Sequence, residues 1–158
     1  ASIICLNLPG NAGTSDVSGV SVESGDGCKL LYPDNHFDIC FSNSVIEHVG
    51  GKAEQAAFAR EIRRVSSRYW VQTPNKWFFI EPHYLCVFVH WLPPKWLKRV
   101  FRWATLRGWL DKKSPEQIES FVDGVRLPSY QELQEMFPDG TILRERFLFM
   151  TKSYIVYR

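Results

Sequence analysis

The chain alternates between strand-like and helix-like segments in residues 37–73, and this order constrains its fold more than any other feature. Phe37–Ser42 is almost continuously apolar, which is typical of a strand that lies in a parallel sheet and is covered on both faces. From Lys52 to Ser66 the apolar residues recur at helical spacing. Arg68–Thr73 is again strand-like, and Pro74-Asn75 ends it. A strand, a helix and a strand in this order predict a parallel pair of strands.

Two further strand-like segments precede this unit, and a strand pair follows it. Ser2–Leu6 and Gly19–Glu23 are short, and a small, polar loop separates them. Thr141–Met150 and Ser153–Tyr157 meet near Thr151-Lys152, which predicts an antiparallel hairpin. We therefore expect an α/β fold, with a Rossmann-like and mostly parallel sheet that ends in a C-terminal antiparallel hairpin.

A second helix is predicted before the hairpin. In Pro128–Phe137, Ser129 can cap the helix, and Glu132 follows three residues later. A serine at the N-cap and a glutamate at this spacing form a capping box, because each side chain binds the backbone N–H of the other residue. The sequence therefore predicts that the helix begins after Ser129.

The composition is that of an ordinary globular domain. The chain has 158 residues, of which 45% are apolar and 23% charged, so we expect one domain with a core of its own. These values exclude a disordered tail, a collagen-like repeat and a miniprotein stapled by disulfides. The net charge of +2 gives no general reason to expect nucleic acid as a partner.

The cysteines and the apolar segments bear on the cellular compartment. Cys5, Cys28, Cys40 and Cys86 form no CxxC pair, which predicts buried free thiols in a reducing cytosol and no metal site. The first residues have neither the apolar length nor the basic flank of a signal peptide. The longest apolar stretch, Trp77–Leu92, contains an acid, a proline and two histidines, and it is too short to span a bilayer. We expect a cytoplasmic protein.

Polar residues follow three of the predicted strands where each strand ends. They are Asn7, then Gly25-Asp26-Gly27, then Ser42-Asn43-Ser44. The carboxyl ends of parallel strands meet at one edge of a sheet, where open α/β folds bind their ligands. An amide can hydrogen-bond a ribose, and a carboxylate can accept an exocyclic amine. Flanking glycines let the backbone approach an aromatic base closely, so the order and spacing of these residues point to a binding site.

With the residues around them, these segments resemble a class I S-adenosylmethionine-dependent methyltransferase. More narrowly, the chain resembles the small-molecule branch that includes the ubiquinone-pathway enzymes. The resemblance covers nearly the whole chain, loosely across residues 80–127. It implies methyl transfer to a small-molecule or lipid-like acceptor, with S-adenosylmethionine as the cofactor. The residues that carry it are Gly25-Asp26-Gly27, Leu31–Asp38, Ser42–Val49, Glu61–Val65, Thr73-Pro74-Asn75 and the terminal hairpin.

The family's cofactor-binding residues can be matched to positions of this chain. By this resemblance, Asp26 contacts the amino group of adenine, and the backbone of Gly27 and Cys28 lies beside the ring. Asn43 and Ser44 match the strand end that lines the methionine side of the cofactor.

Asn7 departs from the family pattern at the ribose. It stands where the family usually has an acidic residue that grips both ribose hydroxyls. An amide can still bond there, but a neutral hydrogen bond is weaker than a charge-assisted one. We therefore expect Asn7 to bind the ribose less strongly than an acid would.

The largest departure from the family is at the front of the chain. The family's first strand and its glycine-rich loop have no counterpart here, and Asn11–Thr14 falls after the family's second strand instead. We therefore expect residues 1–158 to form a single methyltransferase domain that is N-terminally incomplete, with its first strand and glycine loop absent.

A catalytic base is needed only when the methyl acceptor must lose a proton. His48, His83 and Glu81 are the candidates, because the resemblance places them at the mouth of the site, with His48 just below the position of methyl transfer. A purely structural role near the start of the following helix is the alternative for His48.

Residues 77–127 are aromatic and basic, and we call them the lid-like insertion. All six tryptophans lie between Trp70 and Trp109, and seven basic residues against one acid lie between Lys95 and Lys113. Three interpretations remain open: a lid that forms walls of the acceptor pocket, a peripheral membrane contact through residues 91–113, and a core element with a solvated face. The near-neutral net charge disfavours a fourth, nucleic-acid binding.

A non-catalytic function is the alternative to an enzyme. The chain would then be a methyltransferase-like scaffold that binds a membrane surface or a protein partner. The missing glycine loop and the basic insertion favour this alternative. The sequence leaves the oligomeric state and the accepting atom open, because acceptor pockets vary while the fold stays the same.

Overall fold

The strands and helices follow the alternation that the sequence predicts. The computed structural model describes residues 2–8, 10, 13–78, 80–81, 86–87, 92, 94–104 and 114–158. Its elements in chain order are β1 (Ile3–Asn7), β2 (Val20–Ser24), β3 (Cys40–Asn43), the 3-10 helix η1 (Ile46–His48), α1 (Lys52–Val65), β4 (Tyr69–Pro74), β5 (Ile80–Glu81), β6 (Cys86–Val87), α2 (Pro94–Ala104), α4 (Pro115–Asp123), α5 (Tyr130–Met136), β7 (Thr141–Phe147) and β8 (Met150–Tyr157).

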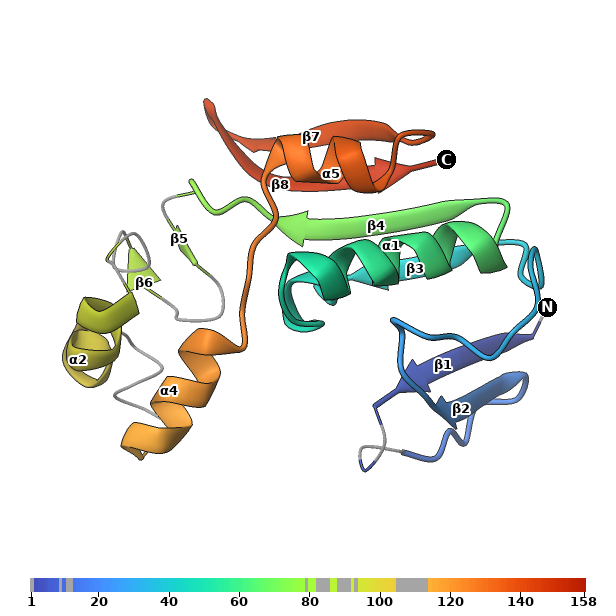
Figure 1. Cartoon of the computed structure of the whole chain (residues 1–158), viewed down its shortest axis with the longest axis horizontal. Helices are drawn as coiled ribbons and strands as arrows, with labels where there is room; N and C mark the ends of the chain where they lie inside the picture. The colour runs from blue at the N-terminus through green and yellow to red at the C-terminus, as the bar shows by residue number, and fades with distance from the viewer. Residues whose placement is uncertain are drawn as a thin grey trace.

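The described strands form three separate sheets (Figure 1). β1 and β2 pair in parallel, with Ile3 opposite Val20. The second sheet has the order β3-β4-β8-β7, in which β3 and β4 are parallel and β8 runs antiparallel to both of its neighbours. β5 and β6 form a short antiparallel pair. The predicted fold class, an α/β fold with parallel strands and a C-terminal antiparallel hairpin, is confirmed. The predicted place of the hairpin turn is wrong, because Phe147 pairs with Met150 and Thr151-Lys152 lies within β8.

The core lies between the four-stranded sheet and the two helices that pack on it, α1 and α5 (Figure 1). α1 buries Phe58, Ala59 and Ile62, because these positions recur at helical spacing on one face. Val71 of β4 and Val156 of β8 oppose each other in the ladder, and both are fully buried. The other buried residues of the core are Ile46, Tyr69, Leu133, Met136 and Phe137.

The strand predicted over Phe37–Ser42 is shorter and less covered than expected. β3 begins only at Cys40, and the ring of Phe37 packs edge-on against that of Tyr32, at 4.8 Å between their centroids. Phe41 is 72% exposed. The prediction of a strand covered on both faces is therefore wrong for the described residues, since the side chains of Phe41 and Asn43 are exposed. β3 is also an edge strand of its sheet.

A charged cluster ties the connection between β2 and β3 to α1. Arg64 donates hydrogen bonds to the carbonyl oxygens of Leu30 and Tyr32, at 3.0 and 2.8 Å, and it pairs with Asp34 at 2.9 Å. It also pairs at 2.7 Å with Glu61, whose Oε2 accepts the N–H of Leu30 at 2.9 Å. The hydrogen bond from Arg64 holds the pKa of the Glu61 carboxyl below its usual range. Charge-assisted bonds therefore fix this connection to the helix.

Two packed helices, α2 and α4, lie within the lid-like insertion. Leu97 of α2 and Ile118 of α4 are buried. Lys98 of α2 reaches across to α4, where it pairs with Glu119 at 3.0 Å and with Asp123 at 2.7 Å. Of the helices that the structure describes, none has the length and apolar character needed to cross a membrane.

The described cysteines are less buried than the sequence predicts. Cys5, Cys28 and Cys40 are free thiols; Cys5 is exposed, and the other two are half-buried. Successive side chains of a strand point to opposite faces, and Cys5 lies on the exposed face of β1. The prediction of buried thiols is therefore wrong for Cys5, and the side chain of Cys86 lies outside the described residues.

The capping box predicted at Ser129 is present at the start of α5. The hydroxyl of Ser129 accepts the N–H of Glu132 at 3.2 Å, and Oε2 of Glu132 accepts the N–H of Ser129 at 2.9 Å. Glu132 also pairs with Arg126. The Ser129 N–H, helped by the Arg126 guanidinium, lowers the pKa of Glu132 to about 2.

We expect Glu132→Gln to lower the free energy of unfolding at neutral pH by about 1–2 kcal/mol, because the amide lacks the charge that these partners stabilise. A carboxyl whose pKa falls on folding stabilises the native state above its unfolded pKa of 4.5, and it loses this contribution as the pH falls toward about 2. Chemical denaturation at a series of pH values measures the difference. Glu135→Gln is the control, since Glu135 lies in an exposed pair with Lys52. If the difference in the free energy of unfolding between Glu132→Gln and the unaltered chain did not shrink at low pH, the stabilising role of the carboxylate would be refuted.

Candidate functional site

The parallel strands direct their carboxyl ends toward the same side of the molecule. In Figure 1, β1, β2 and β4 point the same way, and β3 is parallel to β4. Asn7 is the last residue of β1, Asn43 is the last residue of β3, and Asp26 follows β2. All three residues are exposed. The structure therefore places them at strand ends, where open α/β folds bind their ligands.

The turn that follows β2 is hydrogen-bonded to the end of β1. Asn7 pairs with Ser24 in the ladder, and the N–H of Gly25 donates to the carbonyl of Asn7 at 2.8 Å. A Cβ atom at position 25 would lie 2.9 Å from Cδ1 of Leu6, closer than carbon atoms normally approach. Glycine at this position therefore lets the two strand ends come together.

Asp26 shapes this turn and still presents its carboxylate to solvent. Its Oδ1 accepts the N–H of Cys28 at 2.8 Å, as in an Asx turn. Burial, with a smaller contribution from the charge of Asp26, raises the pKa of the Cys28 thiol. The protonated thiol donates to the carbonyl of Glu54 in α1 at 3.4 Å. Because Asp26 is exposed, its carboxylate can accept further hydrogen bonds from a ligand.

α1 holds both the turn after β2 and the segment after β3. Gly27 packs on Phe58 so closely that a Cβ atom would lie 2.8 Å from Cε2 of the ring. Gln55, one turn away on the same helix, is fully buried and donates to the carbonyl of Ile46 in η1 at 3.0 Å. Neighbouring positions of one helix therefore fix the two halves of the predicted cofactor site.

The chain leaves β3 through a sharp turn at Ser44, whose φ of 54° lies in the left-handed region. The N–H of Ser44 donates to the carbonyl of Gln72 at 3.0 Å, and its hydroxyl donates to Oε1 of the same residue at 3.1 Å. This conformation costs a residue other than glycine about 1–2 kcal/mol, so it persists where the surroundings hold it. The two bonds to β4 hold it here, and Asn43 stays exposed.

η1 carries a buried carboxylate that the sequence analysis did not single out. Glu47 is completely buried, and its Oε2 accepts a hydrogen bond from the hydroxyl of Thr73 at 2.9 Å. The N–H of Arg126 donates to the carbonyl of Glu47 at 2.8 Å. The only signal in the sequence is an acid within an apolar run directly before His48. The burial of this acid follows from contacts with β4 and with the segment after α4.

The three predicted bases are described to different extents. His48 ends η1 and is exposed, on the same segment as Asn43 and Ser44. Glu81 ends β5, but its side chain lies outside the described residues. His83 lies outside them entirely.

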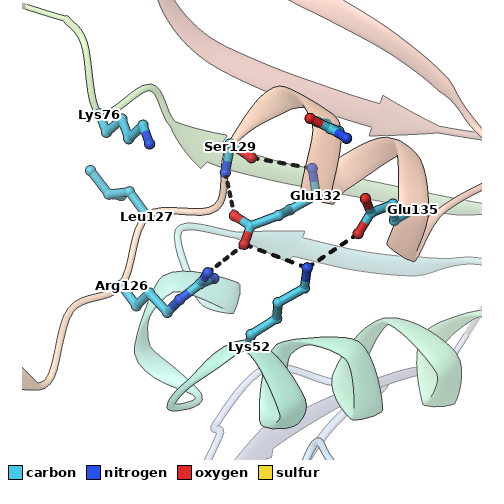
Figure 2. A pocket seen from close by; sticks show the side chains of 8 residues that line it. Lys52, Lys76, Arg126, Leu127, Ser129, Glu132 and Glu135 are labelled. Carbon is cyan, nitrogen blue, oxygen red and sulfur yellow. Dashed lines mark hydrogen bonds and ion pairs between the residues drawn. The ribbon is translucent and has the colours of Figure 1, made fainter.

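A polar pocket of about 510 Å³ lies between α1, α5 and the segments that follow β4 and α4 (Figure 2). Lys52 reaches into it and pairs with Glu135 at 3.3 Å and with Glu132 at 4.0 Å, and Arg126 pairs with Glu132. None of the predicted site residues lines it, so we interpret it as an ion-paired contact between helices. In the part of the chain that the structure describes, no three His, Cys, Asp or Glu side chains gather to hold a metal ion. The other residues that line the pocket are Lys76, Leu127, Ser129 and Gln131.

Sequence comparison finds a match to a known family in part of the chain. Residues 8–68 match the family described as a methyltransferase domain. This range contains β2, β3 and α1, together with Asp26, Asn43 and His48. Among curated proteins, no sequence matches this chain.

Solved structures share the fold of the chain. An S-adenosylmethionine-dependent methyltransferase from Mesorhizobium loti is 16% identical with a TM-score of 0.57, and the match covers 99% of this chain and 79% of that one. A SAM-dependent methyltransferase from Methanosarcina mazei is 13% identical with a TM-score of 0.51, over 99% and 80% of the two chains. PigF, solved with SAH, is 15% identical with a TM-score of 0.52, over 99% of this chain and 47% of that longer one. At these identities the likeness establishes the fold.

The family match and the fold agree with each other. The predicted α/β fold class is confirmed, and the match over residues 8–68 supports the predicted methyltransferase enzyme. The Mesorhizobium loti and Methanosarcina mazei proteins depend on S-adenosylmethionine, which agrees with the predicted cofactor. Residues 8–68 of the chain thus match a methyltransferase domain, and the chain has the fold of the S-adenosylmethionine-dependent methyltransferases.

Proposed function

We propose that the chain transfers a methyl group from S-adenosylmethionine to a small-molecule or lipid-like acceptor, like the small-molecule branch that includes the ubiquinone-pathway enzymes. The observation that carries this proposal is the turn over residues 25–28, which β1 and α1 hold from two sides. When bound, S-adenosylmethionine supplies a methyl group activated on a sulfonium. The residues of the chain bind and orient the reactants and exclude water.

The turn fits the adenosine end of the cofactor. Asp26 has an exposed carboxylate that can accept the adenine amino group, while its bond to the Cys28 N–H fixes its position. Gly25 and Gly27 place no side chain between the backbone and a planar ring. Asn7, whose carbonyl is bonded to the turn, can offer its amide to the ribose.

The segment after β3 fits the methionine end of the cofactor and the site of transfer. The hydroxyl of Ser44 donates its proton to Gln72, so its oxygen can accept a hydrogen bond from an ammonium group. Asn43 is exposed beside it. His48 on the same segment is the proposed base for an acceptor that must lose a proton, with His83 and Glu81 as alternatives.

We also propose a peripheral contact between α2, within residues 91–113, and a cytoplasmic membrane surface. Trp96 is 62% exposed, and Lys95 and Arg99 are exposed on the same helix. Lys98 instead turns to two acids of α4. An exposed tryptophan with neighbouring cations suits the interface of an anionic membrane. Such a contact would bring a lipid-like acceptor to the enzyme.

We expect the chain to bind S-adenosylhomocysteine, and we expect Asp26→Asn to weaken this binding about tenfold, because the amide loses a charge-assisted hydrogen bond to adenine. Asparagine keeps an oxygen for the Cys28 N–H, so the turn stays folded. Isothermal titration calorimetry measures both affinities. Asp16→Asn, which changes an exposed acid outside the turn, is the control. Equal affinity of Asp26→Asn and the unaltered chain would refute the role of Asp26, and no binding by either would favour the non-catalytic scaffold.

Gly27→Ala should reduce both stability and S-adenosylhomocysteine affinity, because the new methyl group would lie 2.8 Å from the ring of Phe58. Overpacking of this kind costs about 1–3 kcal/mol. Gly13→Ala is the matched control, since no atom lies within 4 Å of a Cβ there. Denaturant titration and calorimetry on both variants test the expectation. Equal stability of the two variants would show that the turn accommodates the methyl group without loss of stability.

Asn7→Asp should bind S-adenosylhomocysteine about threefold more tightly or better, because a carboxylate bonds ribose hydroxyls more strongly than an amide does. The same titration measures the change. Unchanged or weaker binding would place the ribose away from Asn7.

A further inference from the structure

Three consecutive apolar side chains are exposed at the tip of the β7–β8 hairpin. Phe147, Leu148 and Phe149 are 51%, 77% and 89% exposed. Isolated apolar residues are common on protein surfaces, but a run of adjacent ones is disfavoured unless it contacts something. These three residues therefore require a partner or a function.

The geometry of the hairpin gives no local reason for apolar residues at this position. Phe147 pairs with Met150, so Leu148 and Phe149 form a two-residue loop. Leu148 has a φ of 54°, in the left-handed region where such loops prefer glycine, asparagine or aspartate. The turn thus carries an apolar side chain at a conformational cost, and the benefit must come from a contact outside the fold.

An exposed tryptophan lies beside the base of the hairpin tip. Asn75, just after β4, donates from its N–H to the carbonyl of Lys152 at 2.9 Å and from its Nδ2 to that of Thr151 at 2.8 Å. These bonds join the turn after β4 to the start of β8, and Phe78 of this turn packs edge-on against Phe147, at 6.2 Å between ring centroids. Trp77, which directly precedes Phe78, is 61% exposed.

We call Trp77, Phe147, Leu148 and Phe149 the hairpin-tip surface. In Figure 1 the hairpin tip lies toward the same side of the molecule as the carboxyl end of β4 and α2. The surface is therefore on the side to which the parallel strands point.

Basic residues lie next to the hairpin-tip surface. Nζ of Lys76 lies 5.3 Å from the centre of the Trp77 ring, and Arg146 next to the tip is exposed. Lys152 pairs with the nearby acid Glu145 at 3.0 Å. Among the described residues of the tip and of the turn after β4, Lys76, Arg144, Arg146 and Lys152 are basic and Glu145 is acidic, so their net charge is positive and complements an anionic surface. Aromatic rings with flanking cations are the residue types that settle at the interface of a lipid bilayer.

We propose that the hairpin-tip surface inserts into the interface of an anionic lipid bilayer. This proposal rests on the proposed function, in which α2 contacts a membrane. It adds a second membrane contact, at a hairpin loop that is distant from α2 in the sequence. The apolar side chains enter the acyl boundary, and Lys76 and Arg146 remain at the level of the lipid headgroups. A membrane bound to this surface would face the side of the molecule at which the parallel strands have their carboxyl ends.

Co-sedimentation with vesicles tests the proposal. The chain is mixed at low salt with vesicles of phosphatidylcholine alone and of phosphatidylcholine with phosphatidylserine, and the bound fraction is measured. We expect binding to the anionic vesicles, and a reduction of about tenfold for Phe149→Ala, because one aromatic ring no longer leaves water. Leu31→Ala is the matched control, since Leu31 is 92% exposed in a segment between β2 and β3.

Each result supports or overturns the proposal. Loss of binding in Phe149→Ala but not in Leu31→Ala supports it. Absence of binding by the unaltered chain, or equal binding by Phe149→Ala, overturns it. A loss confined to Trp96→Ala also overturns it, because α2 alone would then bind. If Phe149→Ala instead converts a dimer to a monomer in light scattering, without vesicle binding, the tip is a contact between copies of the chain.

The same samples separate this proposal from the proposed function. S-adenosylhomocysteine affinity is measured by calorimetry on Phe149→Ala and on the unaltered chain. Vesicle binding without cofactor binding would contradict the methyltransferase function and leave the hairpin contact standing. If Phe149→Ala loses vesicle binding but keeps its affinity for S-adenosylhomocysteine, the hairpin tip binds the membrane and takes no part in cofactor binding.

Discussion

Gln55 makes the contacts on which the arrangement of the candidate site depends. It is fully buried in α1, and its Nε2 donates to the carbonyl oxygens of Ile46 at 3.0 Å and of Arg126 at 2.6 Å. The guanidinium of Arg126 donates back to Oε1 of Gln55. A buried amide with these partners is costly to replace, because its loss leaves backbone groups unpaired in the interior. One side chain thus fastens the segment after β3 and the segment after α4 to the same helix.

The contacts of α1 extend this arrangement to the other half of the site. Glu54 and Phe58 hold the turn after β2, and Arg64 with Glu61 clamps the connection that leads to β3. A helix keeps a fixed rise per residue, so the spacing between these contacts is set by its geometry. Strand ends that lie far apart along the chain are therefore presented to a ligand by one rigid element.

The exposed apolar residues of the lid-like insertion and of the hairpin lie on the side to which the parallel strands point. Trp96 of α2 and the hairpin-tip surface have cations beside them, whereas Lys98 is held back by ion pairs with α4. A lipid-like acceptor delivered from a membrane on this side would meet the ends of the strands first. The proposed binding of the cofactor and the proposed contact with a membrane are thus compatible in one orientation.

Local patterns in the sequence were enough to determine the order of the elements. The helix period from Lys52 and the capping box at Ser129 each depend on neighbours within a few residues, so they could be predicted without knowing the rest of the chain. The C-terminal hairpin could also be predicted, but its turn lies at Leu148-Phe149 and not near Thr151. The same holds for the turn around Asp26, because the glycines beside it and its Asx bond are local features. The resemblance to a family added the cofactor-binding roles that are expected at these positions.

Only the tertiary structure decided which side chains are buried and which are exposed. Glu47 is buried and accepts a hydrogen bond from Thr73, which lies 26 residues away in the sequence. Phe41 is exposed on the face of β3 opposite to the buried Ser42, and Phe149 is exposed in the loop at the tip of the hairpin. Each outcome depends on elements that are distant in the sequence. An apolar stretch of sequence does not indicate whether a helix packs over it. The sequence by itself placed the polar residues Asn7, Asp26 and Asn43 at or just after the ends of β1, β2 and β3, because the change from apolar to polar residues is a local feature. Burial and exposure were settled by long-range packing, because a side chain is removed from water only by the elements that pack over it.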